Sequence, residues 1–76
     1  MKIEVLGMGC AKCNALYGNV RKAAIELGIR PDIEHVRDLM KIADYGVMTT
    51  PALVIDGKVM SSGRIPTVEE IKGWLK

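Results

Sequence analysis

The sequence of 76 residues predicts one α/β domain, in which a mixed four-stranded sheet packs against three helices. β-rich and helix-periodic segments follow one another in the order β-α-β-α-β-β-α. The β-α-β start implies two parallel strands joined by a right-handed crossover. Asp56-Gly57 then separates two β-rich runs, which is typical of a tight antiparallel hairpin. These observations predict the strand order 2-1-3-4, with residues 1–76 forming a single domain.

A change in apolar period separates the first strand from the first helix. Residues 2–6 (KIEVL) are a strand candidate, and Gly7 follows them. After Cys10, apolar residues recur at steps of three and four, as the buried face of a helix requires. They are Leu16, Val20, Ala23, Ala24 and Leu27. Gly28 supplies the end of this helix, and Pro31 prevents its continuation.

Caps and turns predict the remaining elements. Residues 33–36 are the second strand candidate, and Asp38 can cap a short helix after them. Residues 52–55 form the third strand, and the Asp-Gly turn leads into the fourth because it tolerates the positive φ angles of a type I′ turn. Thr67 and Glu70 have the spacing of a capping box and mark the start of the last helix.

The composition argues against several classes of protein. An apolar fraction of 49% is too high for a disordered chain, and no apolar run approaches the ~20 residues of a membrane span. The net charge is +2, with no block of like charge and 4% aromatic residues, which disfavours nucleic-acid binding. Residues 1–8 lack the basic start and apolar run of a signal peptide. We therefore expect a cytoplasmic protein with no nucleic-acid or membrane partner.

The two cysteines, Cys10 and Cys13, are placed for chemistry rather than for stability. A disulfide between residues three apart closes a tiny loop and constrains the unfolded chain very little. The pair lies where the first strand leads into the first helix, whose N-terminal N–H groups and dipole favour a thiolate. Lys12 adds a positive charge with the same effect. We expect Cys10 to attack a substrate disulfide and Cys13 to resolve the mixed disulfide.

These motifs resemble the thioredoxin and glutaredoxin superfamily, and look most like its shortest members, the small redox-active disulfide proteins of archaea and bacteria. The matching segments are residues 9–13 (GCAKC), 49–54 (TTPALV) and 63–66 (GRIP), so the resemblance covers nearly the whole chain. It implies a thioredoxin-like fold and a dithiol–disulfide oxidoreductase that carries electrons. It also implies that Pro51 is cis and packs beside the active-site disulfide, and that the backbone of Thr50 binds the substrate peptide.

Departures from the typical motifs bear on the partners. The cysteine motif lacks the Trp and Gly-Pro of typical thioredoxins and the Pro-Tyr of typical glutaredoxins. Residues 61–64 read SSGR, not the Gly-Gly and acidic residues with which glutaredoxins hold glutathione. We expect protein disulfides as substrates, a reductase that the sequence does not identify, and a monomer. We expect no metal, and no cofactor other than the redox-active Cys10–Cys13 disulfide.

The same cysteines also fit a soft-metal site. Residues 7–13 (GMGCAKC) look like the G-M-T-C-x-x-C loop of heavy-metal-associated domains, and thiolates suit Cu(I). Those domains run β-α-β-β-α-β and end on a strand, whereas this chain ends on a capped helix. A closed zinc site needs four ligands, and His35 is the only other candidate. A copper-type carrier is therefore the alternative function. The simplest interpretation of the two cysteines is a redox-inert disulfide without any function.

Two further residues have more than one interpretation. Glu4 lies six residues before Cys10, the offset at which thioredoxins bury a carboxylate that moves protons for the second cysteine. We expect Glu4 instead to be an ordinary strand residue that faces outward. Pro51 also has a plain interpretation, as a trans proline that opens a strand.

Overall fold

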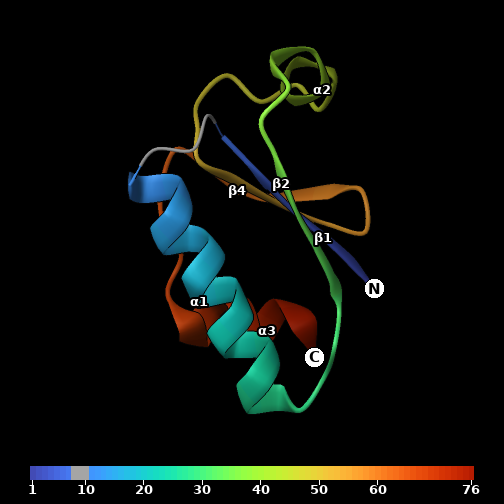
Figure 1. The fold of residues 1–76 in the computed structure, drawn as a ribbon, viewed down its shortest axis with the longest axis vertical. Helices are drawn as coiled ribbons and strands as arrows, with labels where there is room; N and C mark the ends of the chain where they lie inside the picture. The colour runs from blue at the N-terminus through green and yellow to red at the C-terminus, as the bar shows by residue number, and fades with distance from the viewer. Residues whose placement is uncertain (8–10) are drawn as a thin grey trace.

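The computed structural model describes residues 1–7 and 11–76 and contains the seven expected elements in the expected order (Figure 1). Their bounds are β1 (Lys2–Leu6), α1 (Ala11–Leu27), β2 (Asp32–Val36), α2 (Leu39–Asp44), β3 (Ala52–Ile55), β4 (Lys58–Ser62) and α3 (Val68–Leu75). The predicted α/β class is confirmed. Within the described ranges, no helix is both long and apolar enough to cross a bilayer.

The four strands form one mixed sheet in the order β2-β1-β3-β4, which confirms the predicted order. β1 and β2 are parallel, with Ile3 opposite Ile33. β3 runs antiparallel to β1, with Leu53 opposite Val5, and β4 runs antiparallel to β3. The register of the β3–β4 pair shifts between Leu53 and Val54. β1 is therefore an interior strand, and the cysteine motif follows its carboxyl end.

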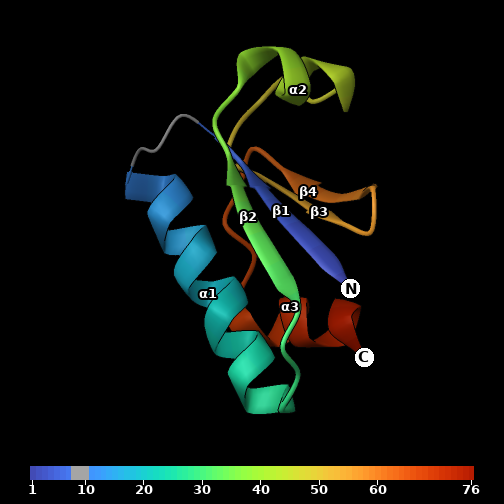
Figure 2. The same cartoon turned by 45° about the vertical axis from the view of Figure 1, so that its right-hand side comes forward.

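Apolar side chains form two clusters, one on each face of the sheet. The larger cluster joins the sheet to α1 and α3, and consists of Ile3, Val5, Leu16, Val20, Ala23, Leu53, Ile55, Ile71 and Leu75. The smaller cluster joins the other face to α2, and consists of Leu6, Val36, Ile42, Ala52 and Val54. Figure 2 shows α2 well apart from α1 and α3. Successive residues of β1 thus face different helices, because strand side chains alternate between faces.

Local sequence signals produce the predicted turns and caps. Asp56 and Gly57 have φ angles of 50° and 83°, as a type I′ turn requires. The Asp38 side chain caps α2 by accepting a hydrogen bond from the backbone of Met40 at 2.9 Å. Thr67 caps α3, and both halves of the capping box are present. β4 includes Ser61 and Ser62, which pair with Leu53 and Ala52 of β3.

Candidate active site

Cys13 lies in the first turn of α1, and its side chain is fully buried. Its sulfur packs against Gly7, the residue that directly follows β1. A Cβ atom built on Gly7 would overlap Cys13 Sγ and would lie 4.0 Å from the Cα atom of Pro51. The predicted resolving cysteine, the end of β1 and the start of β3 therefore meet at one place. The predicted nucleophile, Cys10, lies outside the described residues, so its position relative to Cys13 stays a prediction.

Thr50 and Pro51 lie at the loop that enters β3, and the peptide bond between them is cis. Pro51 is fully buried, whereas Thr50 is exposed. The Pro51 carbonyl accepts a hydrogen bond from the N–H of Gly63 at 2.9 Å. Gly63 has a φ of 75°, and a Cβ atom there would lie 2.7 Å from Thr49 Oγ1. The proline is thus held between the end of β1 and the loop that follows β4.

The loop after β4 is anchored by both helices of the α1 face. The Asn19 side chain on α1 donates to the carbonyl of Pro66 at 3.1 Å. Arg64 makes two hydrogen bonds to Glu70 on α3, at 2.9 and 3.2 Å. These bonds to Arg64, followed by the bond from the backbone of Thr67, lower the pKa of Glu70. The segment that holds Pro51 from the β4 side is therefore itself fixed in place.

Glu4 is buried, so the expectation that it faces outward is wrong. Its exposed fraction is 7%, and it shares the α2 face of the sheet with Leu6. The Tyr45 hydroxyl donates a 2.5 Å hydrogen bond to Glu4 Oε1, a length typical of a bond to a charged oxygen. The outward placement fails because β1 is an interior strand and Tyr45, at the C-cap of α2, lies against this position. A five-residue strand pattern alone does not contain that information.

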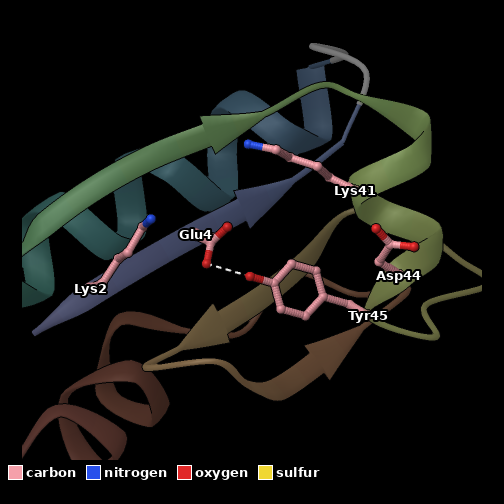
Figure 3. A pocket seen from close by; sticks show the side chains of 5 residues that line it. All are labelled: Lys2, Glu4, Lys41, Asp44 and Tyr45. Carbon is pink, nitrogen blue, oxygen red and sulfur yellow. Dashed lines mark hydrogen bonds between the residues drawn. The ribbon is translucent and has the colours of Figure 1, made fainter.

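Glu4 lines a pocket of about 260 Å³ on this face (Figure 3). Lys2, Lys41, Asp44 and Tyr45 line it together with Glu4. The hydrogen bond to Glu4, with burial and the Glu4 charge adding to it, raises the pKa of Tyr45. The carboxylate is therefore buried within the protein, but it borders a polar pocket rather than an apolar core.

His35 lies near the end of β2 and stacks on Tyr17 of α1, with ring centroids 6.2 Å apart. Its Nε2 atom is buried and has no hydrogen-bond partner among the described residues. Burial, and then the nearby Arg37 charge, lower the pKa of this imidazole. Across residues 1–7 and 11–76, no three or more His, Cys, Asp and Glu side chains come together as a metal site. His35 is thus placed as a packed strand residue in the described structure.

Lys12 is exposed in the first turn of α1, directly before Cys13. The electrostatic role expected for Lys12 stays a prediction. Sequence reasoning missed three other residues of this region: Gly7, Thr49 and Tyr45. In the sequence Gly7 appears only as the residue after the first strand and as the start of the metal-type loop motif, and no local signal links Tyr45 to Glu4, 41 positions away.

A four-stranded 2-1-3-4 sheet, with a buried cysteine at the start of its first helix and a proline before β3, defines a thioredoxin-like protein. The family model described as "Thioredoxin domain" matches residues 1–76. A protein named thioredoxin from Methanocaldococcus jannaschii is 47% identical over 74 residues, covering 97% of this chain and 85% of the relative. Another thioredoxin, from Methanothermobacter thermautotrophicus, is 40% identical over 72 residues, covering 95% and 94%.

The chain therefore belongs to the thioredoxin family, and the resemblance inferred from its motifs is confirmed. Membership supports a thioredoxin-like redox function and, at the general level, a thiol–disulfide oxidoreductase.

Proposed function

We propose that this protein is a small dithiol–disulfide electron carrier whose redox centre is the pair Cys10 and Cys13. The observation that carries the proposal is the burial of Cys13 in the first turn of α1, beside Gly7 and Pro51. A first-turn position offers unpaired N–H groups and the positive end of the helix dipole, both of which stabilise a thiolate. A family whose members carry the name thioredoxin is consistent with that use of the site.

In the proposed reaction the protein reduces a disulfide in two exchanges. The Cys10 thiolate attacks one sulfur of the substrate, and the other substrate sulfur leaves as a thiolate. The Cys13 thiolate then attacks the Cys10 sulfur, which releases the second substrate thiolate and forms the Cys10–Cys13 disulfide. Two electrons pass from the protein dithiol to the substrate, and the two departing thiolates take up two protons. A separate reductase must then restore the dithiol.

The neighbouring residues have supporting roles in this proposal. Lys12 adds a positive charge beside the cysteines and favours their thiolate forms. Thr50, exposed next to the buried Pro51, offers its backbone to a docking peptide. Glu4 has no part in the proposed exchange, because it lies on the α2 face of β1 and Cys13 packs on the other face, against Gly7.

The partners follow from the same proposal. The substrates are protein disulfides, the protein works as a cytoplasmic monomer, and it needs no cofactor other than its own disulfide. The copper-type carrier is less well supported, because heavy-metal-associated domains have the order β-α-β-β-α-β, whereas the elements here follow the order β-α-β-α-β-β-α.

Trapping of the mixed disulfide tests the proposal. Reduced Cys13→Ser protein is mixed with native, disulfide-bonded insulin, and covalent adducts are identified by mass spectrometry. We expect a stable adduct through Cys10, because the residue that would resolve it is missing. The matched Cys10→Ser variant should form at least tenfold less adduct, since its remaining thiol is buried.

Two results would contradict the redox proposal. One is the absence of any adduct with Cys13→Ser, together with failure of the wild-type protein to reduce insulin. The other is a greater yield of adduct through Cys13 than through Cys10, which would reverse the two roles. Tight stoichiometric binding of Cu(I), without a reversible two-electron transition in the metal-free protein, would favour the carrier instead.

A further inference from the structure

The contact between Gly7 and Cys13 depends on the absence of a side chain at Gly7. A Cβ atom at this position would overlap Cys13 Sγ and would lie 3.3 Å from Cys13 Cβ. The sulfur is fully buried, so it occupies the volume that any other residue at position 7 would fill. Interiors are close-packed, and such an overlap is relieved only by moving one of the two groups.

The backbone of Gly7 is held by the sheet. Its N–H donates to the carbonyl of Val36 at 2.9 Å, which extends the β1–β2 pairing one residue past Leu6. The strand end therefore resists displacement, whereas Cys13 carries its sulfur on a single rotatable bond. A methyl group at Gly7 would consequently displace the sulfur first, and the 3.3 Å approach to Cys13 Cβ would need a further small shift of Cys13.

The conformation of Gly7 does not itself require glycine. Its φ lies outside the left-handed range, unlike those of Gly28, Gly57 and Gly63. Alanine can therefore adopt the same backbone without strain. The other near atom, Pro51 Cα, would be at 4.0 Å, an ordinary van der Waals distance. Gly7→Ala thus perturbs Cys13 selectively and leaves the loop with Thr50 and Pro51 in place.

We infer that Gly7 is the positioning residue for Cys13, holding open the space from which the resolving sulfur acts. This inference rests on the proposed function, in which Cys13 attacks the Cys10 sulfur of a mixed disulfide. Exchange requires the attacking sulfur to approach within reach and in the correct direction, and a misplacement of about 1 Å can cost ~100-fold in rate. Displacing Cys13 Sγ should therefore slow resolution, while capture of the substrate by Cys10 continues.

A small chromogenic disulfide separates these two steps. Reduced protein is mixed with substoichiometric 5,5′-dithiobis(2-nitrobenzoic acid), and release of nitrothiobenzoate is followed by stopped flow. Attack by Cys10 releases the first equivalent and leaves a mixed disulfide. Attack by Cys13 releases the second at a rate that is independent of protein concentration, and forms the internal disulfide.

Gly7→Ala should slow the second release at least tenfold and change the first by less than threefold. Gly18→Ala is the matched control, because Gly18 lies in α1 and its Cβ would meet no atom within 4 Å. The control should match wild type in both steps. Equal second-step rates in wild type and Gly7→Ala would overturn the inference. An equal slowing by Gly18→Ala would also overturn it, because the effect would then be one of general stability.

A double-mutant cycle tests the same contact through the free energy of unfolding, with no measurement of activity. Gly7→Ala should lower the free energy of unfolding in the wild-type background and cost clearly less in a Cys13→Ala background, where the sulfur is gone and only the contact with Cβ remains. If Gly7→Ala alone fails to fold, the double variant should fold. An equal cost in both backgrounds, or two unfolded variants, would overturn the inference.

Failure of the proposed function has a different signature. In that case the wild-type protein would release nitrothiobenzoate without forming an internal disulfide, whatever residue occupies position 7. If wild type and Gly7→Ala form that disulfide at the same rate, the proposed function is supported and only the role of Gly7 is contradicted.

Discussion

The two faces of β1 differ in how they are built, although they come from neighbouring residues of one strand. On the α1 face, Val5 belongs to the larger apolar cluster, and Gly7 makes room for the sulfur of Cys13. On the α2 face, Leu6 belongs to the smaller cluster, and Glu4 bonds Tyr45 beside a polar pocket. The first face packs Cys13, one member of the proposed redox pair, closely against the end of β1. The second holds a buried carboxylate by a hydrogen bond from a distant element.

Truncating one leucine on each face should give the largest effects and measure this difference directly. Leu53 and Leu6 are both fully buried, on the α1 and α2 faces respectively. Leu→Ala in a core costs roughly 3–5 kcal/mol where the cavity cannot collapse. We expect about 4 kcal/mol for Leu53→Ala and about 2.5 kcal/mol for Leu6→Ala, because the six-residue α2 can settle into the space more easily.

Urea unfolding followed by circular dichroism measures both costs. A larger loss for Leu6→Ala than for Leu53→Ala would contradict the view that the α1 face is the more rigid of the two.

Removing the Tyr45 hydroxyl should give the next largest effect. Tyr45→Phe leaves the buried Glu4 oxygen without its donor, at a cost of roughly 2 kcal/mol for a bond to a charged group. The free energies of unfolding of Tyr45→Phe, Glu4→Ala and the double variant close a cycle, because each single variant removes one partner of the bond. Their costs should be non-additive by at least 1 kcal/mol, as for groups in direct contact. Simple additivity would mean that the bond contributes nothing to stability.

The same bond predicts a pH dependence at alkaline pH. Because the folded protein raises the pKa of Tyr45 above its ordinary value of 10.0, the folded state binds the phenolic proton more tightly than the unfolded state. This contribution to stability is complete below the unfolded pKa and is lost as the pH rises through the folded pKa. Absorbance near 295 nm in a Tyr17→Phe background reports the ionisation of Tyr45 alone. Glu4→Gln should shift that ionisation to lower pH; an unchanged curve would contradict the assigned cause.

The smallest effects should come from the helix caps, one on each face. Thr67 caps α3 with a complete capping box, whereas Asp38 caps the shorter α2 with one side-chain bond. Loss of a cap lowers the free energy of unfolding by about 1 kcal/mol. We therefore expect a loss of about 1 kcal/mol for Thr67→Ala and of about 0.5 kcal/mol for Asp38→Ala. Thermal unfolding measures both. Nitrothiobenzoate release should be unchanged in either variant, and a slower second release would mean that the caps position Cys13.

Much of the fold could be predicted from the sequence because its signals act over a few residues. The Asp56-Gly57 turn, the Asp38 cap and the capping box at Thr67 each depend on geometry within one turn of chain. The apolar period of residues 11–27 likewise identified a helix with one buried face. These local elements, with the right-handed crossover rule, were enough to predict the strand order β2-β1-β3-β4.

Within the site, the sequence by itself singled out the candidate residues: a cysteine in the first helical turn and, through the family resemblance, a proline before β3. Only the tertiary structure decided that Glu4 is buried under Tyr45, that Gly63 packs on Thr49, and that Gly7 admits the sulfur of Cys13. Each of these contacts joins separate elements, and depends on strand register and on which helix covers which face. A local pattern identifies a glutamate or a glycine in a strand. The residue that it contacts belongs to a distant segment, and the two come together only in the complete tertiary structure.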